Sequence, residues 1–535
     1  MTDSPGKLDY DWIVVGSGFG GSVAALRLSE RGYRVAVLES GRRFTEDDLP
    51  KSTWDLRNYF WFPQIGLRGI LRLTPFRHVL VGSGSAVGGG SIAYANTLHH
   101  AQPSFFTAPQ WAGICDWKRE LEPHYRTAEK YLGVTSLPGD LRRDELLREL
   151  GDHLGTKSPL RPARVGIFFG PPEVPSADPY FGGEGPERRG CTNCGSCMVG
   201  CRHGAKNTLD KNYLYLAEKR GAEVHPSRTV VRIRPRSDED GTNGYAVTSI
   251  RSGALIRKDT RTLTTKGVVV AAGTIGTNLL LANCRHSGDL PRLSSKLGHL
   301  VRTNSESVMA VTTSASQSEI IQAPSITSSI EVDGDTHLQL FSYGPNADSM
   351  SFLFTPLGHL SEKGPFSIQL FATLRHAIRH PIELIRAMLP FRWSKRSVSL
   401  LVMQTTDTAL RFKPRLRWLL GGVRLTTEED PSRPIPRKIP MAHQATKWLS
   451  ERIDGIAQGG TFECLFNIPT TAHLLGGAAI GATPANGVID PRLRVFGYRN
   501  LIVCDGSALP ANPGINPSLT ITALAEFAMS KLDDP

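Results

Sequence analysis

The stretch DWIVVGSGFGGSVAALRLSERGYRVAVLES, residues 11–40, constrains the fold more than any other part of the chain. It combines a buried-strand pattern, a glycine-rich turn, a helical pattern and a second strand pattern. Gly16, Gly18 and Gly21 have the spacing G-x-G-x-x-G, and Glu39 follows about 20 residues further on. Such glycines let the backbone approach a pyrophosphate at the positive end of a helix, and Glu39 can accept hydrogen bonds from both ribose hydroxyls. The sequence therefore predicts an α/β domain that binds an adenine dinucleotide.

A second glycine-rich segment favours FAD over NAD. The acidic Glu39 disfavours the 2′-phosphate of NADP, which leaves these two dinucleotides. The segment VGSGSAVGGGSIAYANTL, residues 81–98, supplies a further stretch of small residues. An NAD enzyme needs one phosphate loop, whereas a flavoenzyme must also lay bare backbone along the isoalloxazine. We therefore expect FAD.

Composition and charge leave several partners open. The chain has 535 residues, enough for two or three domains, with 40% hydrophobic and 21% charged residues. The net charge of +12 would suit a nucleic acid, an anionic membrane or an acidic protein. Basic residues without clustered aromatic platforms give nucleic-acid binding little support. The N-terminal residues lack the pattern of a signal peptide, and no apolar run reaches the roughly 18 residues of a membrane span. We expect a cytoplasmic protein with any membrane contact peripheral.

Four of the eight cysteines lie in the stretch GCTNCGSCMVGCRHGAKNTL, residues 190–209. Their spacing, C-x2-C-x2-C-x3-C, is that of bacterial ferredoxins, although Arg202 replaces the usual proline. Zinc sites usually separate two pairs of cysteines by a longer loop. The preferred interpretation is a [4Fe–4S] or related cluster, and zinc or purely structural cysteines, reduced or disulfide-linked, remain alternatives. The candidate ligands are Cys191, Cys194, Cys197 and Cys201, or three of them with a remote cysteine.

The order of motifs along the chain resembles that of the glucose–methanol–choline (GMC) oxidoreductases, and most closely their bacterial cholesterol oxidase branch. The matching stretches are GSGFGG near the N-terminus, GSAVGGGS at 84–91, VVVAAGTIGTNLLL at 268–281, and a C-terminal AHLLGGAAIG followed by LIVCDGSALPANPGINPSLTITALAE. The resemblance implies a discontinuous, Rossmann-like FAD domain and an α+β substrate domain built on an antiparallel sheet. The FAD domain would comprise 1–105, 190–300 and 465–535, and the substrate domain 106–189 and 301–464.

The resemblance also implies the site residues. His473 matches the active-site histidine of the family that precedes Gly-Gly, and Asn516 matches its second polar group. An imidazole beside an amide suits removal of a hydroxyl proton while the carbinol C–H delivers hydride to flavin N5. A lone histidine between apolar neighbours is more often a core residue, but the Gly-Gly and the downstream NPxxT pattern favour the functional interpretation. The implied FAD contacts are Gly16, Gly18, Phe19, Gly20, Gly21, Glu39, Gly89, Gly90, Ser91, Asn96, Val230, Asp505, Gly506, Asn516, Pro517 and Ser518.

Two positions depart from the pattern of the family. Ser85 and Tyr94 stand where most relatives have a polar or basic residue and an asparagine, with Asn96 two residues further on. Cholesterol oxidases also carry a glutamate on a central strand that moves a proton when the steroid double bond isomerises. Gln339 aligns with that glutamate. Because an amide cannot act as a base, we expect oxidation of the alcohol without isomerisation.

The resemblance implies oxidation of a bulky apolar secondary alcohol, most simply a sterol or other steroid. Electrons would pass to oxygen or, through a cluster, to a quinone or an acidic acceptor protein; the basic flank Arg188, Arg189, Arg202, His203 and Lys206 suits the latter. A long-chain alcohol as substrate, and an electron-transfer module without alcohol turnover, are the alternatives. The basic, amphipathic block 366–400 is a substrate-domain helix or a membrane-surface contact.

Overall fold

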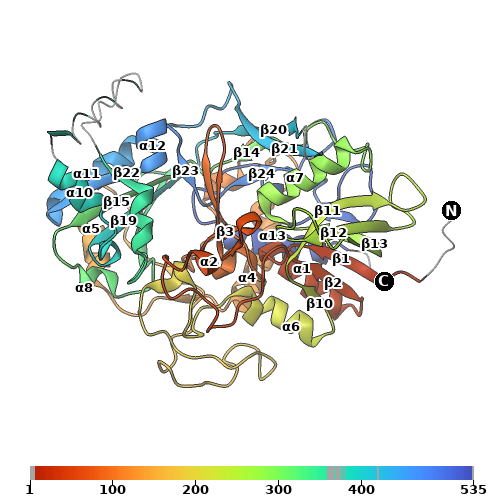
Figure 1. Cartoon of the computed structure of the whole chain (residues 1–535), viewed down its shortest axis with the longest axis horizontal. Helices are drawn as coiled ribbons and strands as arrows, with labels where there is room; N and C mark the ends of the chain where they lie inside the picture. The colour runs from red at the N-terminus through yellow and green to blue at the C-terminus, as the bar shows by residue number, and fades with distance from the viewer. Residues whose placement is uncertain are drawn as a thin grey trace.

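A computed structural model places two large β-sheets in two halves of the molecule (Figure 1). It describes residues 7–357, 381–417 and 421–532, together with the isolated positions 367, 371, 375, 378 and 379. The first sheet lies on the right of Figure 1 and the second on the left, with segments from both chain ends between them.

The first sheet contains the predicted dinucleotide motif. Its order is β10-β2-β1-β13-β12-β11, and β25 also pairs with β13. The central strand β1 runs parallel to β2 on one side and to β13 on the other. The predicted strand, turn, helix and second strand are confirmed as β1, α1 and β2. The strands are β1 (Tyr10–Val15), β2 (Val35–Leu38), β10 (Glu223–His225), β11 (Arg228–Pro235), β12 (Tyr245–Arg251), β13 (Arg261–Val270) and β25 (Leu501–Val503).

Helices bury the faces of this sheet. The strand residues Ile13, Val14 and 268–270 are fully buried, as expected of parallel strands covered on both sides. In Figure 1, α7 lies above the sheet and α6 below it. The helix α1 contacts α13 and α6, and α13 contacts α4. The helices are α1 (Phe19–Glu30), α4 (Trp117–Leu132), α6 (Tyr213–Lys219), α7 (Gly273–His286) and α13 (Ser518–Ser530).

The second sheet is antiparallel throughout, as predicted for the substrate side. Its order is β18-β22-β15-β19-β17-β16-β8. Every residue of β17 is buried, so this strand is covered on both faces. Leu338 and Leu340 belong to the core beneath α5 and α11, and the alternate residues face the first half of the molecule. The elements are β8 (Arg161–Pro162), β15 (Ser307–Thr313), β16 (Ser328–Glu331), β17 (Thr336–Phe341), β18 (Phe354–Pro356), β19 (Ser397–Gln404), β22 (Gly455–Gly460), α5 (Arg142–His153) and α11 (Pro440–Arg452).

Short sheets between the halves position the polar site. The strand β23 (Thr470–Thr471) runs parallel to β6 (Leu80–Gly84), which itself pairs with β5 (Leu71–Pro75). The strand β24 (Leu475–Gly477) runs antiparallel to β14 (His299–Arg302), which also pairs with β20 (Leu410–Leu416), and β20 pairs with β21 (Val423–Glu429). Since β6 ends at the second glycine-rich segment and β23 ends just before His473, the parallel pairing brings these two features to the same place.

The remaining elements are short. They are α2 (Leu56–Tyr59), α3 (Pro103–Phe106), α8 (Ser318–Ile321), α10 (Pro381–Met388), α12 (Thr461–Phe466), β3 (Trp61–Phe62), β4 (Leu67–Arg68), β7 (Thr135–Ser136) and β9 (Arg164–Val165).

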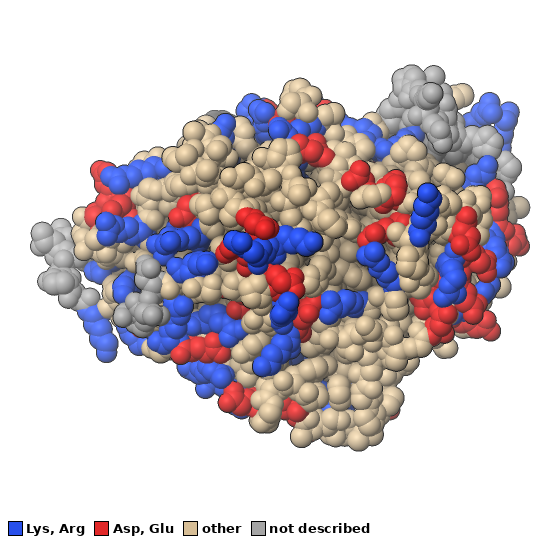
Figure 2. Space-filling view, turned by 180° about the vertical axis from the view of Figure 1, so that it is seen from behind, with Lys and Arg blue, Asp and Glu red and all other residues tan. Residues whose placement is uncertain are grey.

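The strands of each large sheet fall within the ranges expected for the two domains. The helix α4 is different: it lies in the range 106–189, yet Trp117, Leu121 and Tyr125 belong to the core of the first sheet. The domain boundaries themselves stay a prediction. Figure 2 shows that Lys and Arg side chains are interspersed with Asp and Glu on the face it presents, so the net charge of +12 does not gather there into one basic field.

Candidate functional site

The three glycines of the G-x-G-x-x-G motif differ in the space around them: two are closely packed and one has open space beside it. Gly16 has φ of 98°, and a Cβ there would stand 2.3 Å from the carbonyl oxygen of Ala271. A Cβ on Gly21 would stand 2.0 Å from the carbonyl oxygen of Gly16. A Cβ on Gly18 would meet nothing within 4 Å. This is the division of roles that a dinucleotide turn needs: two glycines close the turn and the helix packing, and the middle one lets a ligand approach the backbone.

The start of α1 is open to an anion. Gly18, its N-cap residue, makes no side-chain capping bond, and the first turn contains no acidic residue. The first amide groups of the helix therefore keep their capacity to bind phosphate, and the helix dipole favours a negative charge at this end. The turn also lies where β1 stands between β2 and β13, the switch point at which open α/β sheets bind nucleotides. These residues fit the pyrophosphate of FAD.

Glu39 lies beside this turn with its carboxylate buried. One oxygen accepts hydrogen bonds from the amide and the hydroxyl of Ser17, at 2.9 and 2.8 Å. The other accepts from the amide of Gly41 at 2.6 Å and from the hydroxyl of Ser40 at 3.2 Å. The carboxylate is thus fixed at the end of β2, where ribose hydroxyls would share or replace its present partners.

The second glycine-rich segment contacts the first directly. A Cβ on Gly89 would stand 2.6 Å from the Cα of Gly18, so the two glycine loops touch. Ser91 is held by its hydroxyl, which donates to the carbonyl of Gly88 at 2.7 Å and accepts from the amide of Leu209 at 3.0 Å. Asn96 is fully buried, and neither its amide nitrogen nor its amide oxygen finds a partner in the described part of the chain. A buried amide without partners is costly, which is what a residue that awaits a ligand would present.

The remaining predicted FAD contacts lie in strands or at their ends and at helix starts, and they differ in burial and in hydrogen bonding. Asp505 accepts hydrogen bonds from the amide of Gly273, from Thr277 Oγ1 and from Ser507, and so joins the end of β25 to the start of α7. Burial raises the pKa of Asp505, and these hydrogen bonds oppose the rise. Val230 is buried at a bulge of β11. Phe19, Gly20, Gly506, Pro517 and Ser518 lie at or beside the starts of α1, of the turn after Asp505 and of α13. Their roles as FAD contacts stay predictions.

His473 is paired with a buried carboxylate that the sequence did not point to. Its Nδ1 forms a hydrogen bond with Oε1 of Glu306, whose side chain has no exposed surface. The other carboxylate oxygen accepts from the amide of Ala472 at 2.8 Å. In the antiparallel pairing of β14 with β24, Arg302 lies opposite Leu475. The residues that follow β14, which include Glu306, therefore lie beside those that precede β24, which include His473. Glu306 is 167 residues from His473, so no local pattern could have revealed the pair.

Asn516, the second predicted catalytic residue, is held by Gln339. The amide nitrogen of Gln339 donates to Oδ1 of Asn516 at 3.1 Å and lies 3.0 Å from Nε2 of His337. Gln339 is fully buried on β17. Burial lowers the pKa of His337 well below the usual value of histidine, so its ring is neutral near pH 7. Gln339, which the resemblance places at the position of the isomerising glutamate, thus contacts the predicted site residue Asn516.

Asn304 joins the two polar groups. Its Nδ2 donates to Oε1 of Glu306 at 3.3 Å and to the carbonyl of Ile515 at 3.1 Å. Its Oδ1 accepts from the amide of Gly514 at 3.0 Å, and its own amide donates to Oδ1 of Asn512 at 2.9 Å. One buried side chain thus links the partner of His473 to the loop that ends in Asn516.

Apolar side chains share the face of the second sheet that carries Gln339. Phe341 is on the same face of β17, and Leu401 and Met403 lie on the neighbouring strand β19. They form one buried cluster with Val165, Ile167 and Ile326. A polar pair bordered by such a surface is suited to an alcohol whose remaining atoms are apolar.

The four clustered cysteines line one small cavity. Its volume is about 20 Å³, room for about one water-sized group, and Asn96 and Lys206 also line it. All eight cysteines are free thiols. Burial raises the pKa of the Cys191 thiol to about 12 and also raises that of Cys197. No group of three or more His, Cys, Asp or Glu side chains among the described residues is arranged to hold a metal ion. The four thiols thus lie around one cavity, as their spacing predicted, but they are not arranged as the ligands of a metal ion.

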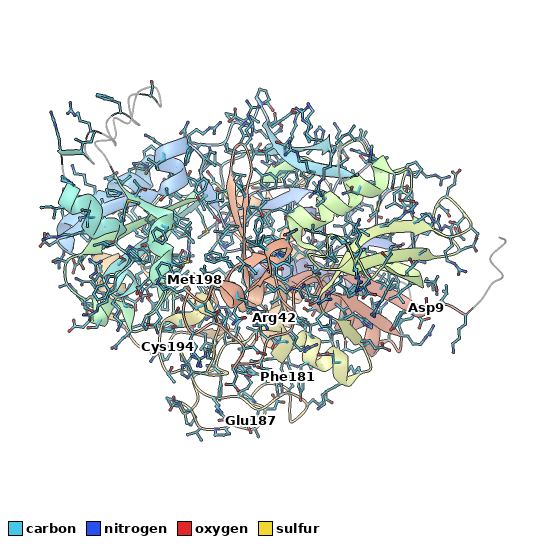
Figure 3. The ribbon with its side chains drawn as sticks, in the orientation of Figure 1. Asp9, Arg42, Phe181, Glu187, Cys194 and Met198 are labelled. Carbon is cyan, nitrogen blue, oxygen red and sulfur yellow. The ribbon has the colours of Figure 1, made fainter. Side chains whose placement is uncertain are left out.

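The cysteine loop, residues 190–209, is hydrogen-bonded to the second glycine-rich segment, residues 81–98, which is called the flavin loop here after its predicted role. The ammonium of Lys206 donates to the carbonyls of Ile92 and Tyr94 at 2.9 and 2.8 Å, and to the carbonyl of Cys197 at 2.9 Å. Figure 3 labels Cys194 and Met198 in this loop, between the second sheet on the left and Arg42 of the dinucleotide half. The loop is therefore tied to the segment that is expected to border the isoalloxazine.

The structure corrects the interpretation of the basic flank. Arg188 and Lys206 are 2% and 1% exposed, and the guanidinium of Arg188 donates to the carbonyls of Gly204 and Lys206. Only Arg189 and Arg202 are exposed, and His203 is half-buried. Two of the five cations are thus structural and cannot present charge to an acidic partner.

The amphipathic block 366–400 lies partly outside the described residues. Its described end includes α10, which exposes Ile382, Ile385 and, just beyond the helix, Leu389 and Phe391. Within the described ranges, no helix has the length and apolar character needed to cross a bilayer.

Comparison with known proteins agrees with this arrangement. The family model described as GMC oxidoreductase matches residues 186–288 and 439–525, and one described as NAD(P)-binding Rossmann-like domain matches 14–46. The chain is 46% identical to a cholesterol oxidase of Mycobacterium tuberculosis, covering 98% of this chain and 91% of that one. It is 42% identical to a cholesterol oxidase of Acinetobacter baumannii, covering 98% and 94%. Its fold is similar to that of pyridoxine 4-oxidase from Mesorbium loti, with a TM-score of 0.63 and 16% identity over 97% of this chain and 99% of the other.

Near-full-length identity above 40% and the matching family models establish the family of this chain. The glycine turn at residues 16–21 together with Glu39, here called the dinucleotide cradle, fits the FAD of that family. The chain belongs to the GMC oxidoreductases, in their cholesterol oxidase-like branch, and is an FAD-dependent alcohol oxidoreductase.

Proposed function

We propose that this enzyme oxidises the secondary hydroxyl of a bulky apolar alcohol, a sterol or other steroid. The observation that carries the proposal is the placement of one polar group of residues, His473 with Glu306 and Asn516 with Gln339, against the buried apolar face of β17 and β19. A site of this kind recognises a single hydroxyl on an otherwise apolar molecule. The names of the relatives, which are cholesterol oxidases, point to the same class of substrate.

The side chains divide the work of oxidation. Bound FAD supplies the acceptor for the hydride that leaves the carbinol carbon. His473 accepts the hydroxyl proton at Nε2, because its Nδ1 is engaged by Glu306. Asn516 orients the substrate oxygen through its Nδ2, because its Oδ1 already accepts from Gln339.

A substrate panel under anaerobic conditions tests this proposal. The purified flavoprotein is mixed with a 3β-hydroxysteroid, a long-chain primary alcohol and benzyl alcohol, and bleaching of the flavin is followed by absorbance. We expect the steroid to reduce the flavin fastest at equal concentration. Faster bleaching by the long-chain alcohol would replace the steroid with that substrate, and no bleaching by any alcohol would favour an electron-transfer module.

The product of a 5-en-3β-ol steroid gives a separate test. The resemblance places Gln339, an amide, at the position of the isomerising glutamate, and the carboxylate of Glu306 beside His473 already accepts hydrogen bonds on both oxygens. We therefore expect the unconjugated 5-en-3-one as the product released by the enzyme. Chromatography of quenched single turnovers distinguishes it from the conjugated 4-en-3-one, whose enzymatic formation would overturn this expectation.

We further propose that Cys191, Cys194, Cys197 and Cys201 hold an iron–sulfur cluster. Support comes from their ferredoxin-like spacing, their shared cavity and the tie through Lys206 to the flavin loop. A cluster there would supply a one-electron acceptor close to the flavin, so that a quinone or a protein could replace oxygen as the final acceptor. The cavity of about 20 Å³ holds one water-sized group, so the loop would have to open around a larger group.

Iron and sulfide analysis of protein purified without oxygen tests the cluster. We expect about four of each per flavin and broad absorbance near 400 nm that dithionite bleaches. Cys194→Ser should remove both and leave the flavin bound. A protein free of iron with intact flavin would overturn the proposal, and zinc at one equivalent would replace the cluster with a structural ion.

Peripheral contact with an anionic membrane is the third part of the proposal. Exposed Ile382 and Ile385 on α10, with Arg386 beside them, have the composition of a helix that lies at a lipid surface. Flotation with vesicles of phosphatidylglycerol and phosphatidylcholine should carry the protein, and Ile382→Glu with Ile385→Glu should reduce its binding. Equal binding by wild type and variant would contradict a role for this face.

A further inference from the structure

We propose that Glu306 is a positioning residue that fixes the tautomer of His473 and balances the charge that the imidazole gains during oxidation. The inference rests on the proposed role of His473 as the group that takes the alcohol proton. It adds to that role a second residue, distant in sequence, that acts only through the histidine.

The hydrogen bonds around Glu306 determine which nitrogen of His473 is free. The carboxylate can only accept, so the bond between it and Nδ1 requires the proton on that nitrogen. Nε2 then carries the lone pair, since the ring of His473 bonds through Nδ1 alone among the described residues. The tautomer with a bare Nε2 is the one that can receive a proton from an alcohol.

The burial of Glu306 makes its charge effective. Its side chain has no exposed surface, whereas that of His473 is 16% exposed. When the alcohol O–H bond breaks, its proton moves to Nε2 and its electron pair stays with the substrate oxygen as the hydride leaves. The imidazole becomes a cation at that moment, and the buried carboxylate beside Nδ1 stabilises it without reorganising.

The backbone before Glu306 is held in an unusual conformation. Asn304 and Ser305 have φ of 56° and 45°, two successive non-glycine residues in the left-handed region. Each such residue costs roughly 1 kcal/mol or more and persists only where its surroundings hold it. Here the hydrogen bonds of the Asn304 side chain to Glu306, Gly514 and Ile515 hold it. The turn thereby places Glu306 beside His473 and fixes the position of both residues relative to the loop that contains Asn516.

A second buried carboxylate offers a matched control. Glu463 is 6% exposed, accepts from the hydroxyl of Ser307, and lies 3.5 Å from Nε2 of His443. It is also a glutamate paired with a histidine, but it does not contact His473 or Asn516. A substitution there changes a contact between a buried glutamate and a histidine without changing the proposed proton acceptor.

Three variants test the inference through the rate of anaerobic flavin reduction. In Glu306→Gln the side-chain NH2 must point either toward the amide of Ala472 or toward Nδ1 of His473. The first orientation sets two donors against each other, and the second no longer holds the proton on Nδ1. We expect the limiting rate to fall about 10²-fold or more, with little change in the alcohol concentration at half-maximal rate. Glu306→Asp should restore part of the rate. Glu463→Gln should retain the wild-type rate even if it lowers the melting temperature.

A second readout does not depend on turnover. In the holoenzyme labelled with ¹⁵N-histidine, the ring signals of His473, assigned by their loss in His473→Ala, report which nitrogen is protonated. We expect the proton on Nδ1 in wild type and a changed distribution in Glu306→Gln. A proton on Nε2 in wild type, or a Glu306→Gln enzyme that contains its flavin and reduces it at the wild-type rate, would overturn the inference. If no alcohol reduces the wild-type flavin, the proposed function fails while the ring signals still decide the role of Glu306.

Discussion

The dinucleotide cradle and the polar site beside it are built in opposite ways. The cradle is made of backbone, and its turn, helix start and acidic residue lie within residues 16–41. The polar site is made of side chains from four separated segments, around residues 304–306, 337–339, 473 and 516. The first leaves space beside its backbone, and the second holds two polar groups in one orientation. Substitutions should therefore separate cofactor binding from chemistry.

The largest effect should come from His473→Ala, which removes the proposed proton acceptor and leaves the dinucleotide cradle unchanged. Loss of the proton acceptor should reduce the limiting rate of anaerobic flavin reduction about 10³-fold, within the range typical of a general base. FAD content should stay at the wild-type level because no residue of the cradle changes. His443→Ala, outside the site, is the control. An equal loss of FAD and of rate in His473→Ala would mean that the two regions are not separable.

An intermediate effect should come from Gly18→Ala, which changes the dinucleotide cradle and leaves the polar site unchanged. A methyl group there meets no protein atom within 4 Å, so the apoprotein should keep its melting temperature, but the methyl would occupy space beside the backbone where the pyrophosphate is expected. We expect FAD affinity to fall about tenfold, about 1.4 kcal/mol. Gly113→Ala also meets nothing within 4 Å and should change neither quantity. Unchanged FAD affinity in Gly18→Ala would place the pyrophosphate elsewhere.

The most gradual effect concerns the pH dependence of the free energy of unfolding at His99, which lies outside both regions. Burial lowers the pKa of His99, which lies beside His337, to about 4. Between pH 6.5 and 4 the unfolded chain binds a proton at His99 that the folded protein does not, so the free energy of unfolding falls as the pH falls through this window. The slope from this group approaches about 1.4 kcal/mol per pH unit at most.

Chemical denaturation of wild type and His99→Gln at several pH values measures this contribution. The wild type should lose stability more steeply below pH 6.5, and the two slopes should agree above pH 7. Identical slopes throughout would show that His99 takes up its proton in the folded state as readily as in the unfolded one.

The cradle could be predicted from sequence because its requirements are local. Gly16, Gly18 and Gly21 must recur at fixed spacing for the turn to close and the helix to pack, and β1 and β2 follow at short range. Local spacing also predicted that the four thiols of residues 191–201 would meet. It did not predict that the cavity they line is small, nor that Arg188 and Lys206 beside it are buried as structural cations.

The polar site was only half predictable. His473 and Asn516 stand next to glycine and proline motifs that predict their roles, and Gln339 follows from the resemblance to the family. Glu306 stands in an unremarkable stretch, TNSESVMA, with no motif around it. Its role depends on the antiparallel pairing of β14 with β24 and on the left-handed turn at Asn304 and Ser305. Neither feature has a signature that a single sequence can reveal.

The sequence by itself determined that this protein carries an FAD-binding α/β domain and an antiparallel substrate side, and it predicted His473 as the residue that takes the alcohol proton. Only the tertiary structure decided which carboxylate contacts that histidine, that Asn304 bonds both to this carboxylate and to the carbonyl before Asn516, and that Lys206 ties the cysteine loop to the flavin loop. The reason is physical. Backbone conformation and helix capping depend on residues a few positions apart, whereas a buried hydrogen-bond network depends on which strands pair, and that choice is made by the whole core.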